Sequence, residues 1–154
     1  EATGKKVVPV PPDGHCPVHA VITREELEAA KGEHPHAKVL AHPECPRAVR
    51  QLADFIGSTS QMVKVAGELK ASEYIVATEI GLLHRLRKLG VRAYPASGYS
   101  VCVEMKKITL GSIVDSLVSG RGVVNVDEKV ATRARDAIAR TFELLGVPLP
   151  WSRS

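Results

Sequence analysis

The chain has 154 residues, of which 44% are hydrophobic and 25% are charged, enough for one domain of ordinary size with its own core. No apolar run approaches the ~20 residues that cross a bilayer, so we expect no membrane span. The net charge of +4 comes with only 4% aromatic residues, which argues against a nucleic-acid surface and suits a small anionic ligand. Three scattered cysteines without a Cys-x-x-Cys motif argue against a disulfide scaffold or a zinc ribbon, and they fit a reducing cytoplasm.

The first predicted elements are a strand, a turn and a capped helix. Residues 5–10 are rich in valine and predict a strand that runs into a Pro/Gly turn at residues 11–14. The Thr-x-x-Glu pattern from Thr23 to Glu26 is a capping box. We therefore expect a helix that begins after Thr23 and ends near Gly32.

Four short apolar runs follow, and each of them ends in small polar residues. The runs cover residues 38–41, 53–56, 74–77 and 91–94. Helical patterns follow the first three runs, beginning near Pro46, Ser60 and Ile80. Strands that alternate with helices predict a parallel sheet covered by helices. The predicted fold class is therefore α/β, a small three-layer αβα domain over residues 1–100.

The pattern becomes helix-rich beyond residue 100. Residues 109–118 predict one helix, and Asp127 is placed to cap a longer one. We therefore assign residues 101–154 to a second region, which consists of a loop around Cys102 and a helical C-terminal tail.

The polar residues that end the apolar runs nominate an active face, because open α/β sheets bind ligands at the carboxyl ends of their strands. At Gly57-Ser58-Thr59 a strand passes into a helix, whose free N–H groups favour phosphate or carboxylate. The hydroxyls of Ser58 and Thr59 add further donors. The alternative interpretation is a plain N-cap.

A second polar cluster, His42-Pro43-Glu44-Cys45, places an imidazole, a carboxylate and a thiol before a helix. In one interpretation Cys45 is a nucleophile activated by the helix N-terminus. In another, His42 and Glu44 form an acid/base and orienting pair. In the third, Cys45 is a small buried residue and Glu44 forms a salt bridge. The residues alone leave all three open.

A third cluster, at residues 15–19, contains ligand-type side chains. It has two histidines and Cys16 within five residues, and folding would have to bring Cys102 to it from most of a chain length away. Isolated cysteines are more often structural than metal ligands. The cluster by itself therefore does not define a metal site.

Five blocks of the sequence together resemble the quinolinate synthase family, and its archaeal members most closely. They occur in the family's order and at compatible spacing, and they extend across almost the whole chain. The blocks are residues 14–19, 41–45, 57–60, 75–86 and 102–110. Any one block is weak, but all five together are specific.

The resemblance implies an enzyme that condenses iminoaspartate with dihydroxyacetone phosphate to give quinolinate for de novo NAD synthesis. It also implies a 4Fe-4S cluster with three cysteine ligands, whose open iron acts as a Lewis acid. Cys16 and Cys102 match two of these ligands, whereas Cys45 matches a non-ligand cysteine. The matched catalytic residues are Glu44, His42 and His19. The matched substrate contacts are His42, Pro43, Glu44, Ser58 and Thr59.

The resemblance covers only the C-terminal half of the family. The other half would supply the third cysteine ligand and further substrate contacts, so we expect the chain to be inactive alone and to need that N-terminal half or a second chain. It could then be one subunit of a split enzyme. Two other hypotheses are a non-catalytic anion-binding α/β module that uses Ser58 and Thr59, and a cysteine hydrolase built on Cys45.

Overall fold

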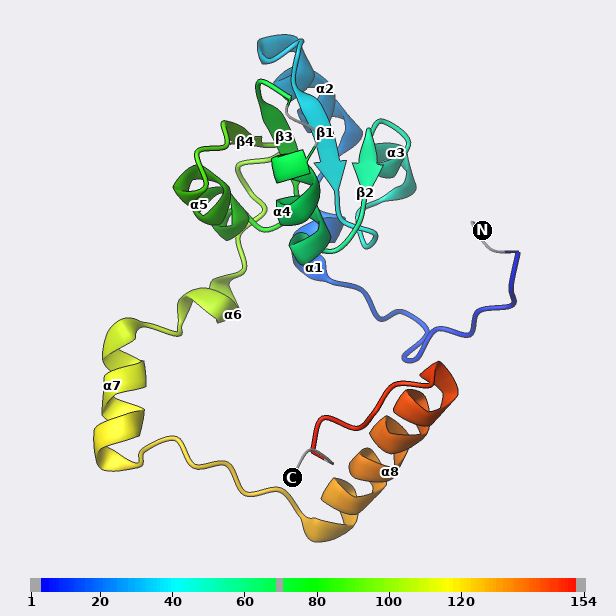
Figure 1. The fold of residues 1–154 in the computed structure, drawn as a ribbon, viewed down its shortest axis with the longest axis vertical. Helices are drawn as coiled ribbons and strands as arrows, with labels where there is room; N and C mark the ends of the chain where they lie inside the picture. The colour runs from blue at the N-terminus through cyan, green and yellow to red at the C-terminus, as the bar shows by residue number, and fades with distance from the viewer. Residues whose placement is uncertain (1–3, 69–70, 152–154) are drawn as a thin grey trace. The chain divides into compact units, whose positions relative to one another are not determined.

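The computed structural model describes residues 4–68 and 71–151. The chain forms two compact units, which divide between Lys107 and Ile108. The first unit contains a sheet with its helices, and the second contains the helices α7 (Leu110–Ser119) and α8 (Glu128–Leu145) (Figure 1). Among the described residues, no helix combines the length and the apolar character that crossing a membrane requires.

The first unit is an α/β structure with four parallel strands, which confirms the predicted fold class. The strands lie in the order β2-β1-β3-β4. They are β1 (Lys38–Ala41), β2 (Phe55–Ile56), β3 (Tyr74–Ala77) and β4 (Ala93–Pro95). The helices are α1 (Pro17–Ala20), α2 (Arg24–Glu33), α3 (Arg47–Arg50), α4 (Thr59–Glu68), α5 (Gly81–Lys88) and α6 (Val103–Lys106).

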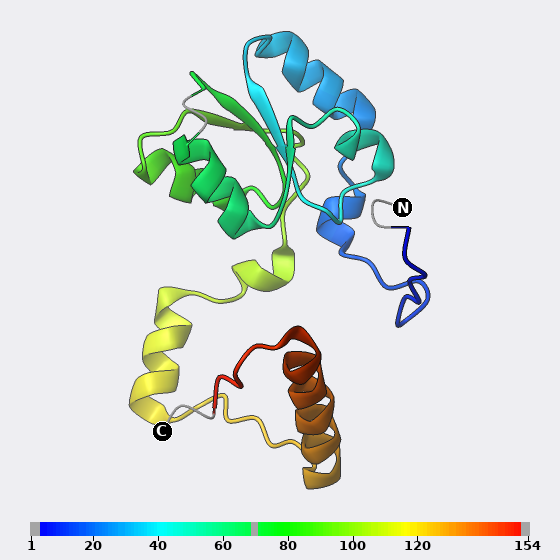
Figure 2. The same ribbon diagram turned by 45° about the vertical axis from the view of Figure 1, so that its right-hand side comes forward.

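The two central strands are buried on both faces, as expected for a parallel sheet covered by helices. In β1, Val39 and Ala41 pack with residues of α2 and α3, whereas Leu40 between them packs with residues of α4 and α5. In β3, Ile75 packs on the side of α2 and α3, and Val76 packs on the side of α4 and α5. This alternation produces two cores and three layers, with α2 and α3 on one side and α4 and α5 on the other (Figure 2).

The order of the strands places a topological switch point between β1 and β3. From β1 the chain passes over one face, through α3, to β2 at the edge. It returns through α4 on the other face to β3 and continues through α5 to β4. The chain therefore leaves neighbouring strands β1 and β3 in opposite directions. Such a switch point, at the carboxyl ends of the strands, is where open α/β sheets bind ligands.

Several local predictions are confirmed in detail. The bounds of β1 and β3 are those of the predicted apolar runs. The capping box at the start of α2 is present, because Glu26 N donates to Thr23 Oγ1 at 3.2 Å and Thr23 N donates to Glu26 Oε2 at 3.0 Å. The turn at residues 11–14 is closed by a hydrogen bond from Gly14 N to Pro11 O at 3.0 Å.

The predicted strand at residues 5–10 is wrong. This segment lies outside the sheet and has no regular secondary structure. Its three valines, Val7, Val8 and Val10, are all more than 70% exposed. High strand propensity reflects how well a side chain packs on a half-buried sheet, and here no neighbouring strand supplies that surface.

The second unit consists of α7 (Leu110–Ser119) and α8 (Glu128–Leu145), both well capped. Thr109 and Ser112 form a reciprocal cap on α7, and Asp127 Oδ1 accepts from two backbone N–H groups at the start of α8, as predicted. Yet neither helix buries a single residue among those described. Capping alone therefore sets the ends of these helices, and packing contributes little to them.

Candidate functional site

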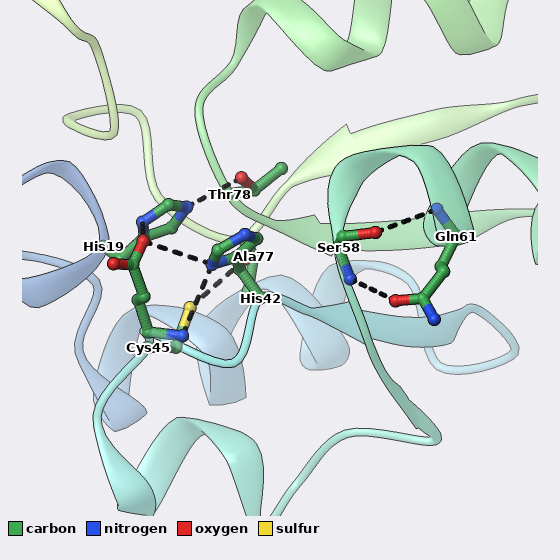
Figure 3. Close-up of polar contacts among 8 residues, drawn as sticks. His19, His42, Cys45, Ser58, Gln61, Ala77 and Thr78 are labelled. Carbon is green, nitrogen blue, oxygen red and sulfur yellow. Dashed lines mark hydrogen bonds and ion pairs between the residues drawn. The ribbon is translucent and has the colours of Figure 1, made fainter. Parts of the chain in front are cut away.

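A cluster of polar side chains lies where β1 and β3 end. His42 follows β1, Thr78 follows β3, and His19 reaches the same place from α1 (Figure 3). His19 Nε2 lies 2.9 Å from Thr78 Oγ1, and the His19 ring stacks on the His42 ring with centroids 4.1 Å apart and planes 7° apart. Both His19 and Thr78 are buried. The switch point of the sheet therefore carries two stacked imidazoles.

Glu44 joins the two imidazoles through the turn after β1. Its Oε2 lies 3.2 Å from His19 Nδ1, without hydrogen-bond geometry, and 3.5 Å from His42 Nδ1. Its backbone N–H donates to His42 Nδ1 at 3.3 Å, so in this arrangement the His42 proton belongs on Nε2. The turn is closed by Cys45 N donating to His42 O at 3.0 Å, and Pro43 is exposed at its tip.

The environment of His19 favours its neutral form. Burial lowers its pKa from the ordinary value of 6.5, the nearby His42 lowers it further, and Glu44 opposes both effects. A neutral imidazole has one donor and one acceptor nitrogen, so His19 can hold or pass a proton near neutral pH. The Glu44 side chain is 53% exposed and therefore open to a ligand.

Cys45 has none of the properties of a nucleophile. Its side chain is 2% exposed, its Sγ donates to Ala77 O at 3.2 Å, and burial raises the pKa of the thiol to about 11. Because the thiolate is the reactive form, this thiol stays inert at neutral pH. The structure contradicts the nucleophile interpretation of Cys45, and with it the cysteine-hydrolase hypothesis, and it agrees with a small buried residue.

A cavity of about 490 Å³ opens beside the stacked imidazoles. Cys16 and Cys102, far apart in the sequence, both line it. Both cysteines are half-buried, and neither is in a disulfide. His19, Thr59 and Thr78 line the same cavity, so folding places the two matched cysteines together with several of the predicted site residues.

The side chains around this cavity supply some of the ligands that an iron–sulfur cluster requires. Iron–sulfur clusters are held by cysteine thiolates, and Cys16 and Cys102 present two unpaired thiols to one cavity. Ligand atoms of Cys16, His19 and Glu44 also lie within 4.8 Å of one another. The third cysteine of the chain is Cys45, whose buried thiol bonds to Ala77 O. A cluster bound here through three cysteines would therefore take its third thiolate from outside this chain.

Ser58 and Thr59, which were both predicted to donate to an anion, have different environments. Ser58 Oγ accepts from Gln61 N at 3.3 Å and Ser58 N donates to Gln61 Oε1 at 2.8 Å, which is a reciprocal cap on α4. Thr59 lines the cavity instead. Gly57 allows this tight turn, because a Cβ there would meet the Phe55 ring at 2.6 Å. Ser58 thus caps the helix with its hydroxyl oxygen, whose O–H can still donate to a ligand, and Thr59 lines the cavity.

Four polar or charged residues that line the cavity were not among the predicted site residues: Thr78, Glu79, Arg85 and Lys106. Thr78 and Glu79 directly follow β3, so they belong to the strand-end polar residues that nominated the active face, although neither was assigned a role there. Lys106 lies at the end of α6, where the sequence carries no signal for it. Its ammonium pairs with Glu79 Oε1 at 3.0 Å and adds a positive charge to the cavity wall.

Comparisons with known proteins match one family over nearly the whole length of the chain. The family model described as Quinolinate synthetase A protein matches residues 1–143. Proteins named quinolinate synthase are similar over nearly the whole chain: 41% identity in Thermotoga maritima over 95% of this chain, 44% in Pyrococcus furiosus over 94%, and 45% in Pyrococcus horikoshii over 92%. The aligned region covers 49%, 48% and 47% of those relatives, respectively. The chain therefore spans about half the length of the curated relatives it matches.

Proposed function

The chain belongs to the quinolinate synthetase A family, and on that premise we propose that it is the C-terminal half of a quinolinate synthase acting in NAD biosynthesis. The proposed reaction condenses iminoaspartate with dihydroxyacetone phosphate to quinolinate. One observation carries the proposal: Cys16 and Cys102 line the same cavity as His19 and Thr59 at the switch point of the sheet. This brings ligand-type thiols, a proton carrier and a hydroxyl donor within reach of one small anionic substrate.

Cys16 and Cys102 are the proposed holders of a 4Fe-4S cluster. When bound, such a cluster supplies an open iron that polarises substrate oxygen atoms as a Lewis acid. Because the chain offers two suitable thiolates, the third would come from the complementary half, by which we mean the part of the family's length that this chain does not span. An iron–sulfur cluster and three unpaired thiols both suit a reducing compartment, and we place the protein in the cytoplasm.

The remaining site residues bind the substrate and move protons. Thr59, which lines the cavity and carries a hydroxyl donor, is the proposed contact to a substrate phosphate or carboxylate. Glu44 is the proposed acid/base, because its half-exposed carboxylate can exchange protons with solvent and lies 3.2 Å from His19 Nδ1. His19, fixed by Thr78 and by stacking on His42, orients that carboxylate. Pro43 and Ser58 shape the two turns that present Glu44 and Thr59.

The decisive experiment is anaerobic iron–sulfide reconstitution of the full chain with and without the complementary half. We expect about four irons per complex and quinolinate formation when both halves are present, and neither when the chain is alone. Cys16→Ser and Cys102→Ser should each abolish iron uptake by the complex. Full cluster content and turnover in either variant would overturn the assignment of that ligand.

A non-catalytic anion-binding module is the alternative function. The observation in its favour is that Thr59 and Lys106 line one cavity and neither requires iron to bind an anion. Calorimetry of the iron-free chain with phosphate and with quinolinate separates the two functions. Tight binding by the chain alone, unaffected by Cys102→Ser, would favour the module, whereas binding that appears only with the complementary half favours the enzyme.

A further inference from the structure

Glu79 is a carboxylate with three partners from different parts of the first unit. Its side chain is only 13% exposed. Oε2 accepts from Gly81 N at 2.7 Å, and Oε1 accepts from Cys102 N at 3.3 Å and lies 3.0 Å from Lys106 Nζ. One carboxylate therefore joins the end of β3 and the start of α5 to both ends of the short helix α6. It lines the same cavity as the residues it holds.

The way in which Glu79 contacts Cys102 leaves the thiol free. Cys102 is the N-cap of α6, but its side chain makes no capping hydrogen bond. Glu79 takes the Cys102 backbone N–H instead. The backbone of this residue is thus fixed from one side, while the half-buried residue lines the cavity with a free thiol.

The position of Gly81 supports the same role. A Cβ at this residue would lie 2.5 Å from Glu79 Oε2 and 3.1 Å from Lys106 Nζ. The glycine therefore makes room for the carboxylate and its ammonium partner. A further hydrogen bond, from Ile80 N to Ser100 O at 3.0 Å, connects the loop before Cys102 to the residue that follows Glu79.

We infer that Glu79 is a positioning residue, which orients Cys102 and Lys106 toward the cavity by holding the Cys102 backbone and the Lys106 ammonium on one carboxylate. Its importance for the reaction rests on the proposed function, because Cys102 is there a cluster ligand. The role itself concerns only the apoprotein. Hydrogen bonds to charged groups are among the stronger single contacts in proteins, so losing several at once should free the loop.

The test uses the alkylation rates of the three cysteines in the full, iron-free chain, resolved by peptide mass spectrometry. Glu79→Ala should raise the iodoacetamide rate at Cys102 about tenfold, because the loop opens more often. Cys16 should change little, and buried Cys45 should stay protected as an internal reporter of folding. Glu73→Gln is the matched control, since Glu73 is also a mostly buried carboxylate with ion-pair partners, Arg92 and His34.

Lys106→Met is the second variant, which removes one partner of Glu79 at a half-exposed position. This variant should also raise the alkylation rate at Cys102 selectively, by a smaller factor. It provides the test of the inference if Glu79→Ala does not fold. Unchanged Cys102 rates in both variants would overturn the inference, and so would equal acceleration of all three thiols. Failure of the proposed function would show separately, as a reconstituted wild-type complex without iron while the thiol pattern still holds.

Discussion

The three cysteines show how burial decides chemistry at the scale of a residue. Cys16 and Cys102 are partly exposed at one cavity, whereas Cys45 is enclosed in the core with α2 and α3. Desolvation disfavours a charged thiolate, which is why the pKa of Cys45 rises to about 11. The same residue type therefore serves as a packing group in one place and as a candidate ligand in two others.

We predict that Cys45→Ala weakens the fold without affecting iron. The substitution deletes a buried sulfur and its hydrogen bond to Ala77 O, so the free energy of unfolding should fall by about 1–2 kcal/mol. Urea denaturation measures this loss. Iron content of the complex with the complementary half should match wild type, and a drop comparable to that of Cys16→Ser would contradict the non-ligand assignment.

Asp54 provides a prediction of pH dependence away from the cavity. Its Oδ2 accepts from Val39 N and its Oδ1 from Lys38 Nζ, both at 2.8 Å. Burial acts to raise the pKa of Asp54, but the hydrogen bonds from Lys38 and Val39 outweigh it and lower the pKa below the ordinary 3.8. The contribution of Asp54 to stability is therefore complete above pH 3.8 and lost as the pH falls through the folded-state pKa.

Asp54→Asn should accordingly lower the free energy of unfolding by about 1 kcal/mol at pH 7, a value reduced for partial solvent screening. The difference from wild type should shrink below about pH 4. Thermal unfolding followed by circular dichroism over this pH range measures both effects. Asp136→Asn, on the exposed surface of α8, controls for the loss of one negative charge, and an equal pH profile in that variant would refute the assignment to Asp54.

At the scale of an element, the start of α4 separates helix capping from ligand binding. Ser58→Ala should cost about 1 kcal/mol of stability, because it removes the N-cap hydroxyl. Thr59→Ala should leave stability nearly unchanged and weaken phosphate or quinolinate binding by about tenfold, the loss expected for one hydrogen bond to a charged ligand. Chemical denaturation measures the stability of both variants, and calorimetry measures their affinity for the ligand. A loss of stability only in Thr59→Ala, together with a loss of affinity only in Ser58→Ala, would disprove this division of roles.

Elements with a local cause could be predicted from the sequence, and those that depend on distant partners could not. The capping box at Thr23 and the buried runs at residues 38–41 and 74–77 each contain their own signal, and their bounds are confirmed. The valines of residues 5–10 carry the same strand propensity, yet the segment pairs with no strand. Propensity predicts where a strand can form, but a neighbouring strand must complete it.

The site depends still more on the order of the strands. The contact between His19 and Thr78 joins residues 59 positions apart, because α1 reaches the end of β3. His42 lies beside them because β1 and β3 are neighbours, although β2 lies between them in sequence. The rule that ligands bind at strand ends could predict which residues face the site, but not which of them meet. Ser58 and Thr59 show the same limit, because adjacent residues of similar chemistry point to a helix end and to a cavity, respectively.

At the scale of the whole molecule, the helices of the second unit expose large apolar side chains. Those on α7 and α8 that are at least 77% exposed are Leu110, Leu117, Val118 and Leu144. Soluble monomers seldom leave such patches uncovered. This exposure fits a chain that spans about half of its relatives' length, and burial against a further protein surface would remove these side chains from water.

We therefore predict that the isolated chain associates as its concentration rises. Sedimentation velocity should show a growing weight-average mass, which the double substitution Leu117→Glu and Leu144→Glu reduces, because charges oppose apolar contact. Thr141→Glu, on the exposed surface of α8, adds a charge without removing an apolar group and should change the mass little. A chain that stays monomeric at all concentrations would contradict this prediction. So would a control variant that lowers the weight-average mass as much as the double substitution does.

The capping box of α2 has a consequence for how the first unit opens. While Glu26 Oε2 accepts from Thr23 N, its Oε1 accepts from Ser97 Oγ at 2.7 Å, a contact between residues 71 positions apart. Ser97 O in turn accepts from fully buried Ser100 Oγ, two residues before Cys102. The first turn of a helix and the approach to the cavity thus share one carboxylate. Amide protons of both segments should therefore exchange with deuterium as a single cooperative unit, and Glu26→Gln should accelerate exchange at both places together.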